Sequence, residues 1–239
     1  MKKTAAVIIL LLTVTTLYAG WKYSDYTSTD YKNFRNNPIF QQKIDPEKID
    51  YPLANAAIFF MTNEIRVKNG LKPLDYSEEL EIAAWHHSKL MAEKKFFSHT
   101  NSLDSTRRTP TARGKLAGIT NPSLAENIAE NFGITYRAGA TIYPRNIANG
   151  EFSYTSNGPI IPFHTYLSLA ESLVTQWMNS PGHRRNILSG SALQMGCGVY
   201  FYRDRGFYNI LKCRATQNFQ WFKPIVKGER ADRLPSELK

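Results

Sequence analysis

The stretch from Ser172 to Leu188 constrains the fold more than any other part of the chain, and it reads S-L-V-T-Q-W-M-N-S-P-G-H-R-R-N-I-L. Its first half has the spacing of a helix with one buried face. That face is formed by Leu169, Leu173, Gln176 and Trp177. Ser168 and Glu171, three residues apart, predict a capping box at the start of this helix.

The second half of the stretch is expected to stop the helix and to present a histidine. Pro181 lacks a backbone donor and Gly182 tolerates a positive φ, so the sequence predicts a tight turn that holds His183. A histidine in such a turn is either a functional group or a capping or core residue.

Two further helices are predicted upstream. The first covers residues 53–67 and ends at Gly70. The second is capped by Ser77, and its periodic positions are Leu80, Ala83, Ala84, His87 and Met91. His87 therefore falls on the buried face, which predicts a satisfied core histidine rather than a ligand.

The charge of the chain bears on its partners. The formal net charge is +10 over 239 residues, and the Lys and Arg residues are scattered. Such a charge favours anionic lipid or polymer surfaces as partners, and the alternative is a basic surface that water solvates. There is no recognised nucleic-acid motif or long basic run, so no nucleic-acid partner is expected. A hydrophobic content of 42% is typical of one globular domain with short flanking segments.

Four flanking or inserted segments differ in composition from the rest of the expected domain, which covers residues 51–220. Residues 1–19 have the charged start and apolar stretch of a signal peptide, which predicts an exported protein, secreted or held at the periplasm or cell surface by an uncleaved anchor. Residues 20–50 predict a linker or wrapping arm, and residues 221–239 predict a charged, flexible tail. The Gly- and Pro-broken stretch 133–163 is either a lid or rim or a passive surface excursion.

The two cysteines flank a predicted hairpin. Its strands cover residues 198–203 and 207–212. A three-residue loop at 204–206 would place Cys197 opposite Cys213, where a disulfide is sterically possible and would suit an exported protein. The alternative is two free, half-buried thiols.

Six motifs in order resemble those of the CAP superfamily, which includes cysteine-rich secretory proteins, insect venom antigens and plant pathogenesis-related proteins. They are Asn63-Glu-Ile-Arg66, Phe97-Ser-His99-Thr100, Ala125-Glu-Asn-Ile-Ala129, the stretch from Trp177 to Leu188, Gly196-Cys-Gly-Val-Tyr200, and Thr216-Gln-Asn-Phe219. Arg113 with Gly118 also matches the family, between the second and the third of these motifs. The resemblance is greatest to the bacterial secreted branch. It implies an α+β fold, an α-β-α sandwich with a central, mainly antiparallel sheet between two helical layers.

The resemblance also implies a cavity where two histidines and two acids converge. His99, Glu126 and His183 stand at three of these positions, whereas Ser180 stands where animal and plant members have the second acid. Two imidazoles and one carboxylate are a ligand set for a divalent metal such as zinc, with weak binding expected because one acid is missing. Alternatively, Glu126 pins the sandwich by a charge-assisted hydrogen bond to a histidine. Glu171 is not expected to replace the missing acid.

Three classes of function remain open. The favoured one is a non-enzymatic module that binds a lipid, a peptide or a divalent metal in the cleft, or a host or cell-surface partner. A hydrolase is disfavoured because the sequence has no nucleophile elbow, no reactive cysteine beside a histidine and no His-Glu-x-x-His helix. Ser180 and Ser98 lie near histidines in sequence, but a triad is recognised by geometry. The third class is a structural or adhesive surface protein.

Overall fold

The computed structural model describes residues 20–237, so the predicted signal peptide lies outside the described residues. The helices are α1 (Asp25–Ser28), α2 (Tyr51–Lys68), α3 (Glu78–Glu93), α4 (Pro110–Leu116), α5 (Tyr166–Met178) and α6 (Pro181–Ile187). The strands are β1 (Asp75–Tyr76), β2 (Leu124–Phe132), β3 (Tyr143–Asn146), β4 (Glu151–Ser153), β5 (Ala192–Asp204) and β6 (Ile210–Trp221). Short 3₁₀ helices cover Phe34–Asn36, Pro38–Gln41, Ser105–Arg107, Arg205–Phe207 and Pro235–Glu237. Within residues 20–237, no helix has the length and apolarity needed to cross a membrane.

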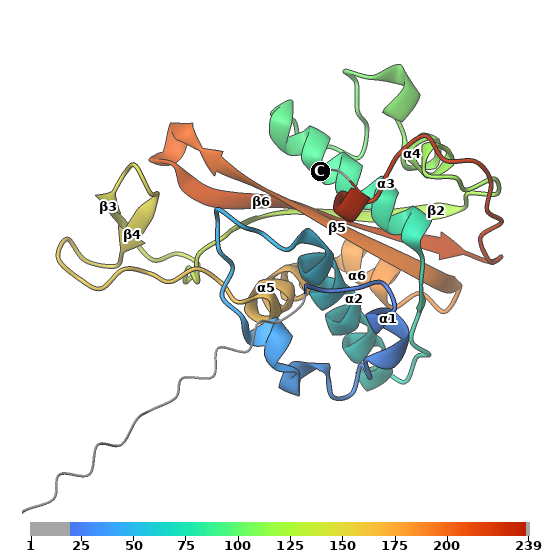
Figure 1. The fold of residues 1–239 in the computed structure, drawn as a ribbon, viewed down its shortest axis with the longest axis horizontal. Coiled ribbons are helices and arrows are strands. Elements are labelled where there is room, and N and C mark those ends of the chain that lie inside the picture. The colour runs from blue at the N-terminus through green and yellow to red at the C-terminus, as the bar shows by residue number, and fades with distance from the viewer. Residues whose placement is uncertain (1–19, 238–239) are drawn as a thin grey trace, which may run out of the picture.

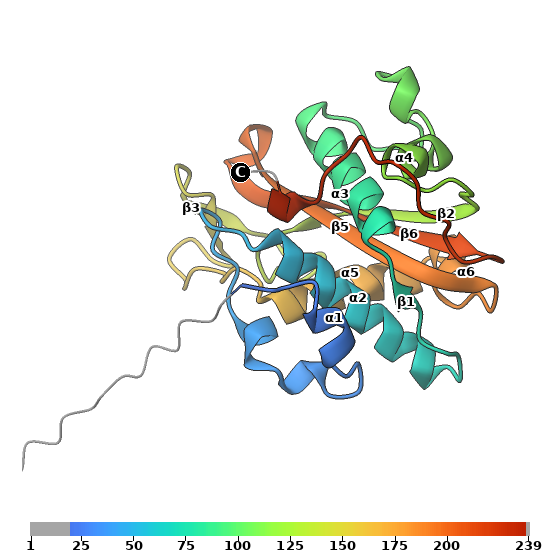
Figure 2. The same cartoon turned by 45° about the vertical axis from the view of Figure 1, so that its right-hand side comes forward.

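The main sheet has the strand order β1-β5-β6-β2. The β5–β6 and β6–β2 pairs are antiparallel, and only the two-residue β1 runs parallel to β5 among these pairs. Figures 1 and 2 show α3 and α4 on one face of this sheet and α2, α5 and α6 on the other. The predicted α-β-α sandwich with a mainly antiparallel sheet is therefore confirmed.

Two glycines of β5 set the distance between the sheet and α3. A Cβ atom on Gly196 would lie 2.1 Å from the backbone nitrogen of Glu81, and one on Gly198 would lie 2.1 Å from that of Trp85. Real Cβ atoms do not approach this closely, so only glycine permits this contact between helix and strand. The motif Gly-Cys-Gly thus brings α3 directly against β5.

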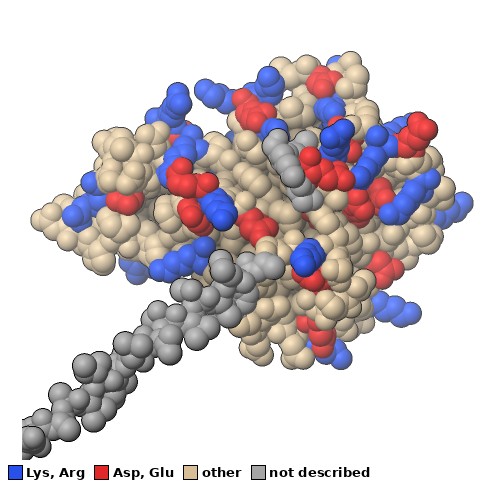
Figure 3. Space-filling model, in the orientation of Figure 1, with Lys and Arg blue, Asp and Glu red and all other residues tan. Residues whose placement is uncertain are grey.

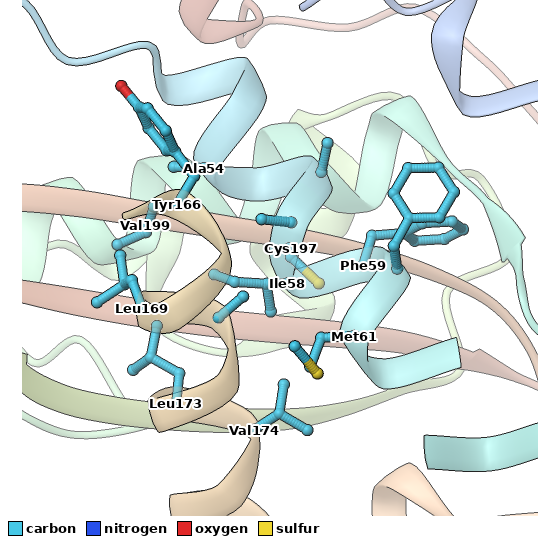
Figure 4. Packing of buried hydrophobic residues seen from close by; sticks show 14 of the residues in the cluster. Ala54, Ile58, Phe59, Met61, Tyr166, Leu169, Leu173, Val174, Cys197 and Val199 are labelled. Carbon is cyan, nitrogen blue, oxygen red and sulfur yellow. The ribbon is translucent and has the colours of Figure 1, made fainter. Parts of the chain in front are cut away.

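The main core lies between the opposite face of the sheet and the layer formed by α2 and α5. Figure 4 shows this cluster, which includes Ile58, Met61, Leu169, Leu173, Val174, Cys197 and Val199. Trp177 is fully buried in it, as the helical stripe predicted. Gln176, which was expected on the same stripe, is exposed, because its position lies at the edge of the buried face.

The ends of the central helix differ from the prediction. Thr165, not Ser168, is the N-cap of α5, and Ser168 stands at the third position of the capping box. The predicted turn after this helix is the start of α6, because Pro181 occupies a first-turn position where its missing N–H costs no hydrogen bond. His183 therefore lies on a short helix.

The predicted hairpin register is wrong. Cys197 pairs with Gln217, and Cys213 pairs with Phe201. The connection between β5 and β6 is longer than three residues, because Tyr208 and Asn209 adopt left-handed conformations after the 3₁₀ turn. Both cysteines are free and buried. The structure therefore contradicts the Cys197–Cys213 disulfide and agrees with the alternative of two free thiols, except that these are buried rather than half-buried.

The segments around the sandwich pack against it. The arm before α2 contributes Trp21, Tyr26, Phe34, Phe40 and Ile44 to the main core. The tail after β6, expected to be flexible, has buried residues as far as Leu234, and Arg107 binds Asp232 at 2.6 Å. The long insertion at 133–163 holds the antiparallel β3–β4 hairpin, which projects from one end of the sheet in Figure 1.

Candidate functional site

Glu126 is the centre of the site that the sequence predicted. It lies on β2, an edge strand of the sheet, opposite Asn218, and it is 7% exposed. Its Oε1 accepts a hydrogen bond from His99 Nδ1 at 2.9 Å, and its Oε2 accepts one from Arg113 Nη2 at 2.6 Å. Burial alone would raise the pKa of this carboxyl, but the hydrogen bond from His99 and the charge of Arg113 outweigh burial and lower it. Glu126 is therefore ionised at neutral pH.

Arg113 is a component of the site whose role was not foreseen. Its side chain comes from α4 and is 1% exposed, paired with a carboxylate that is 2% exposed. Besides Glu126, it donates to the carbonyl oxygens of Arg107 at 3.0 Å and of His99 at 3.1 Å. A single buried guanidinium thus fixes both the carboxylate and the backbone that carries His99. The sequence placed Arg113 only within a family motif, because a contact across many residues leaves no periodic signal.

His87 also reaches this cluster, from α3. It is fully buried, its Nε2 lies 3.0 Å from the Ser98 carbonyl oxygen, and the same atom is 3.9 Å from Glu126 Oε1. Burial lowers the pKa of His87 to about 4, so the ring is neutral at pH 7. Its burial confirms the predicted core position. Its Nδ1, however, has no hydrogen-bond partner among residues 20–237, so only one of the two ring nitrogens is paired there.

His183 approaches the same edge strand from the opposite layer. Its carbonyl oxygen accepts a hydrogen bond from Asn127 Nδ2 at 3.2 Å, which fixes α6 beside Glu126. The imidazole is partly exposed. Burial and, to a smaller extent, the nearby His99 lower the pKa of His183. The structure therefore brings His99, Glu126 and His183 to one edge of the sheet.

Ser180 lies at the start of α6, close in sequence to His183, whereas Glu171 points to the N-terminal arm. Ser180 is the N-cap of α6, and its side chain makes no capping hydrogen bond. Glu171 is exposed on α5 and forms an ion pair with Arg35 at 3.2 Å. Its carboxylate is thus engaged by the N-terminal arm.

The donor set does not form a preassembled metal centre. Among residues 20–237, no group of three or more His, Cys, Asp or Glu side chains is placed to hold a metal ion. Both oxygens of Glu126 and the Nδ1 of His99 already have partners within the protein. The groups left for a ligand are the outer nitrogen of His99 and the imidazole of His183. The three-ligand zinc site therefore stays a prediction.

The described residues also give no geometry for a serine nucleophile at this edge. A hydroxyl–imidazole hydrogen bond does occur elsewhere, between Ser168 and His164 Nδ1 at 2.9 Å. Ser168 is there part of the capping box of α5 and His164 is buried, so this pair is structural.

The comparisons with known proteins give one family model and two bacterial relatives. A family model described as "CAP: Cysteine-rich secretory protein family" matches residues 59–219. The chain is 30% identical over 138 residues to the uncharacterized protein YkwD of Bacillus subtilis (strain 168), covering 58% of this chain and 39% of that protein. It is 27% identical over 162 residues to the uncharacterized membrane protein YlbC of the same organism, covering 68% of this chain and 33% of that protein. The chain thus spans less than two fifths of either relative.

Two solved bacterial structures are also similar. One is an extracellular protein containing an SCP domain from Bacillus anthracis, with 23% identity and a TM-score of 0.47, covering 75% of this chain and 45% of that chain. The other is a cysteine-rich secretory protein from Staphylococcus aureus, with 18% identity and a TM-score of 0.41, covering 72% of this chain and 39% of that chain.

Proposed function

The chain belongs to the CAP, or cysteine-rich secretory protein, family, and we propose that it is an exported, non-enzymatic binding module that takes its ligand between His99 and His183. The observation that carries this proposal is the orientation of His99. Its side chain is 49% exposed while its Nδ1 is held by the 2%-exposed carboxylate of Glu126. The Nδ1 of the ring is thus fixed by Glu126, and the rest of the ring is open to solvent.

The ion pair behind His99 supports a binding role. A carboxylate that accepts from Nδ1 sets the tautomer of the ring and leaves the lone pair on Nε2. Arg113 neutralises Glu126 and fixes the backbone of His99, so the ring is preorganised. A ligand that donates a hydrogen bond, such as a peptide or a lipid headgroup, or one that accepts a lone pair, such as a divalent metal, matches this arrangement.

Export is part of the same proposal. It is supported by the charged start and apolar stretch within residues 1–19 and by the extracellular family member from B. anthracis. A host or cell-surface partner is the biological setting that follows from export.

Zinc is the probe that tests whether His99 and His183 share a ligand. Calorimetry near pH 7 is expected to show weak, reversible zinc binding, which is lost in His99→Ala and in His183→Ala. Glu171→Gln is the matched control, because Glu171 pairs with Arg35 instead of facing this edge. Since protonated imidazole cannot bind metal, zinc binding should weaken as the pH falls through the titration of His183, whose pKa burial holds below the ordinary value for histidine.

Zinc binding by the double variant His99→Ala/His183→Ala can contradict the proposal. Thermal unfolding checks that the variants are folded. His183→Ala should change the midpoint little because the ring is partly exposed, whereas His99→Ala should lower it because buried Glu126 loses a hydrogen bond. If the folded double histidine variant binds zinc as tightly as the wild type, the two rings do not form a ligand site. Glu126 then serves only to pin the sandwich.

A further inference from the structure

A second cavity, separate from the His99–His183 edge, lies at the other end of the α3 face of the sheet. Its volume is about 640 Å³, and it is bordered by the end of α3 and by strands β2, β5 and β6. Figures 1 and 2 both show the end of α3 beside the β5–β6 turn. Glu130 in this cavity is four residues beyond Glu126 on β2, about 13 Å at the rise of a strand. We call it the basic pocket.

The charge of the basic pocket is unbalanced. Its lining includes five basic side chains, Lys95, Arg203, Arg205, Lys212 and Arg214, against two acidic ones, Glu130 and Asp204, which leaves a local charge of +3. Figure 3 shows Lys and Arg interspersed with Asp and Glu over the face that it draws.

The two acidic side chains, Glu130 and Asp204, are paired with other residues of the pocket. Glu130 accepts from the Tyr202 hydroxyl at 2.7 Å and from Arg214 Nη1 at 2.6 Å. Asp204 binds Lys212 Nζ at 2.7 Å. The side chains of Lys212 and Arg214 are only 17% and 14% exposed, so this network forms a rigid, polar floor. It also neutralises itself and does not compensate the remaining cations of the pocket.

Three further cations border the pocket, and one of them is paired. Arg203 donates to the Asn149 carbonyl oxygen at 2.5 Å and forms an ion pair with Glu47 at 3.4 Å, on a side chain that is 30% exposed. Lys95 and Arg205 are exposed, and neither forms an ion pair or a side-chain hydrogen bond with any residue between 20 and 237. Two free cations thus face solvent from two different elements.

The backbone at Lys95 is a second, independent observation. Lys95 has a φ of 56°, and the next amide, from Phe96, donates to the Met91 carbonyl oxygen at 3.1 Å. This is the helix-ending motif in which the left-handed position is usually glycine. A lysine is uncommon at this position. The turn ends α3 beside the cavity, and Lys95 is one of the residues that line it.

We propose that the basic pocket binds a phosphate-bearing ligand. A carboxylate carries one negative charge and one plane of acceptors, whereas a phosphate carries up to two charges and accepts from several directions. Lys95, which follows the end of α3, and the cations of the β5–β6 hairpin border such a group from two elements, and the cavity volume leaves room for the rest of the ligand. The ligand is either a free phosphate compound or the headgroup of an anionic phospholipid.

Inorganic pyrophosphate and vesicles are the probes that separate these sources. Calorimetry measures pyrophosphate binding at low salt, with acetate at equal ionic strength as competitor. Co-sedimentation measures binding to phosphatidylcholine vesicles with and without phosphatidic acid. The test variant is Lys95→Gln/Arg205→Gln. The matched control is Lys48→Gln/Lys115→Gln, which removes two exposed lysines outside the pocket and changes the net charge equally.

The proposal expects binding to be at least about tenfold weaker in the pocket variant, because charge-assisted contacts are lost, and nearly unchanged in the control. Acetate should not displace pyrophosphate. Binding of pyrophosphate without acidic vesicles identifies a free phosphate compound, and binding of acidic vesicles identifies a headgroup. Equal weakening in both double variants, or no binding of either probe by the wild type, overturns the proposal. None of these variants alters His99 or His183, so the result is independent of the zinc experiment.

Discussion

At the scale of single residues, Glu81 is a fully buried carboxyl held only by neutral donors. Its Oε1 accepts from Asn55 Nδ2 at 2.9 Å, and its Oε2 accepts from the Tyr26 hydroxyl at 2.9 Å. Among the described residues, no Lys, Arg or His lies within ion-pair distance of it. Burial raises the pKa of Glu81 to about 7, although the hydrogen bonds from Asn55 and Tyr26 lower it. The contrast with Glu126, whose pKa is lowered, comes from the guanidinium of Arg113 and the hydrogen bond from His99.

Glu81→Gln is therefore expected to change how stability depends on pH. The carboxyl ionises near its usual pKa of 4.5 in the unfolded chain but near 7 in the folded protein, so its contribution to stability falls as the pH rises between these values. The variant has no such group. Its free energy of unfolding relative to the wild type should rise by about 3 kcal/mol from pH 4.5 to pH 8.

Urea denaturation of both proteins across this pH range measures the difference, and the effects of all other groups cancel. Glu229→Gln, at an exposed glutamate, is the control for the loss of one carboxylate. A difference for Glu81→Gln that does not change with pH would show that folding does not raise the pKa of Glu81.

At the scale of the elements, the contact between α3 and β5 depends on the absence of two side chains. Gly198→Ala should lower the free energy of unfolding by about 1–3 kcal/mol or more, because the new Cβ would lie 2.1 Å from the Trp85 backbone nitrogen and neither backbone can shift freely. Gly190→Ala is the control, since nothing lies within 4 Å of its added Cβ. Chemical denaturation of the two variants compares them directly. Equal stability would mean that α3 does not press on β5 at Gly198.

The elements also show what local pattern can and cannot predict. The apolar period of α5 placed Leu169, Leu173 and Trp177 correctly, because burial repeats with the turn of the helix. The register of β5 with β6 could not be predicted in the same way. It depends on the length of the connection, and the left-handed residues Tyr208 and Asn209 that lengthen it are not glycines.

At the site, too, sequence motifs predicted single residues but not the contacts between elements. His99, Glu126 and His183 were found because family motifs carry them, and the structure brings them to one edge strand. The contacts of Arg113 and His87 with Glu126 were missed, because they join different elements and leave no spacing in the sequence. The short helix α6 was read as a turn, since proline and glycine signal both a stop and a start.

At the scale of the whole molecule, the family match and the folded unit do not have the same limits. The family model covers residues 59–219, yet the aromatic side chains of the N-terminal arm belong to the main core. Trp21 lies 5.2 Å from Phe40 and 5.7 Å from Phe60 of α2, measured between ring centroids. Such packed aromatic pairs indicate that the arm and the sandwich share one core.

Phe40→Ala should therefore destabilise the whole molecule rather than release the arm alone. Phe40 is 0% exposed, and truncation of a buried phenylalanine costs about 3–5 kcal/mol. Leu103→Ala, at a side chain that is 64% exposed, should change stability by less than about 0.5 kcal/mol. Because the arm and sandwich share a core, tryptophan fluorescence and far-UV circular dichroism should report a single, coincident transition in both variants, earlier in denaturant only for Phe40→Ala. A separate early transition in fluorescence, with the midpoint by circular dichroism unchanged, would show instead that the arm is an independent appendage and that residues 59–219 fold without it.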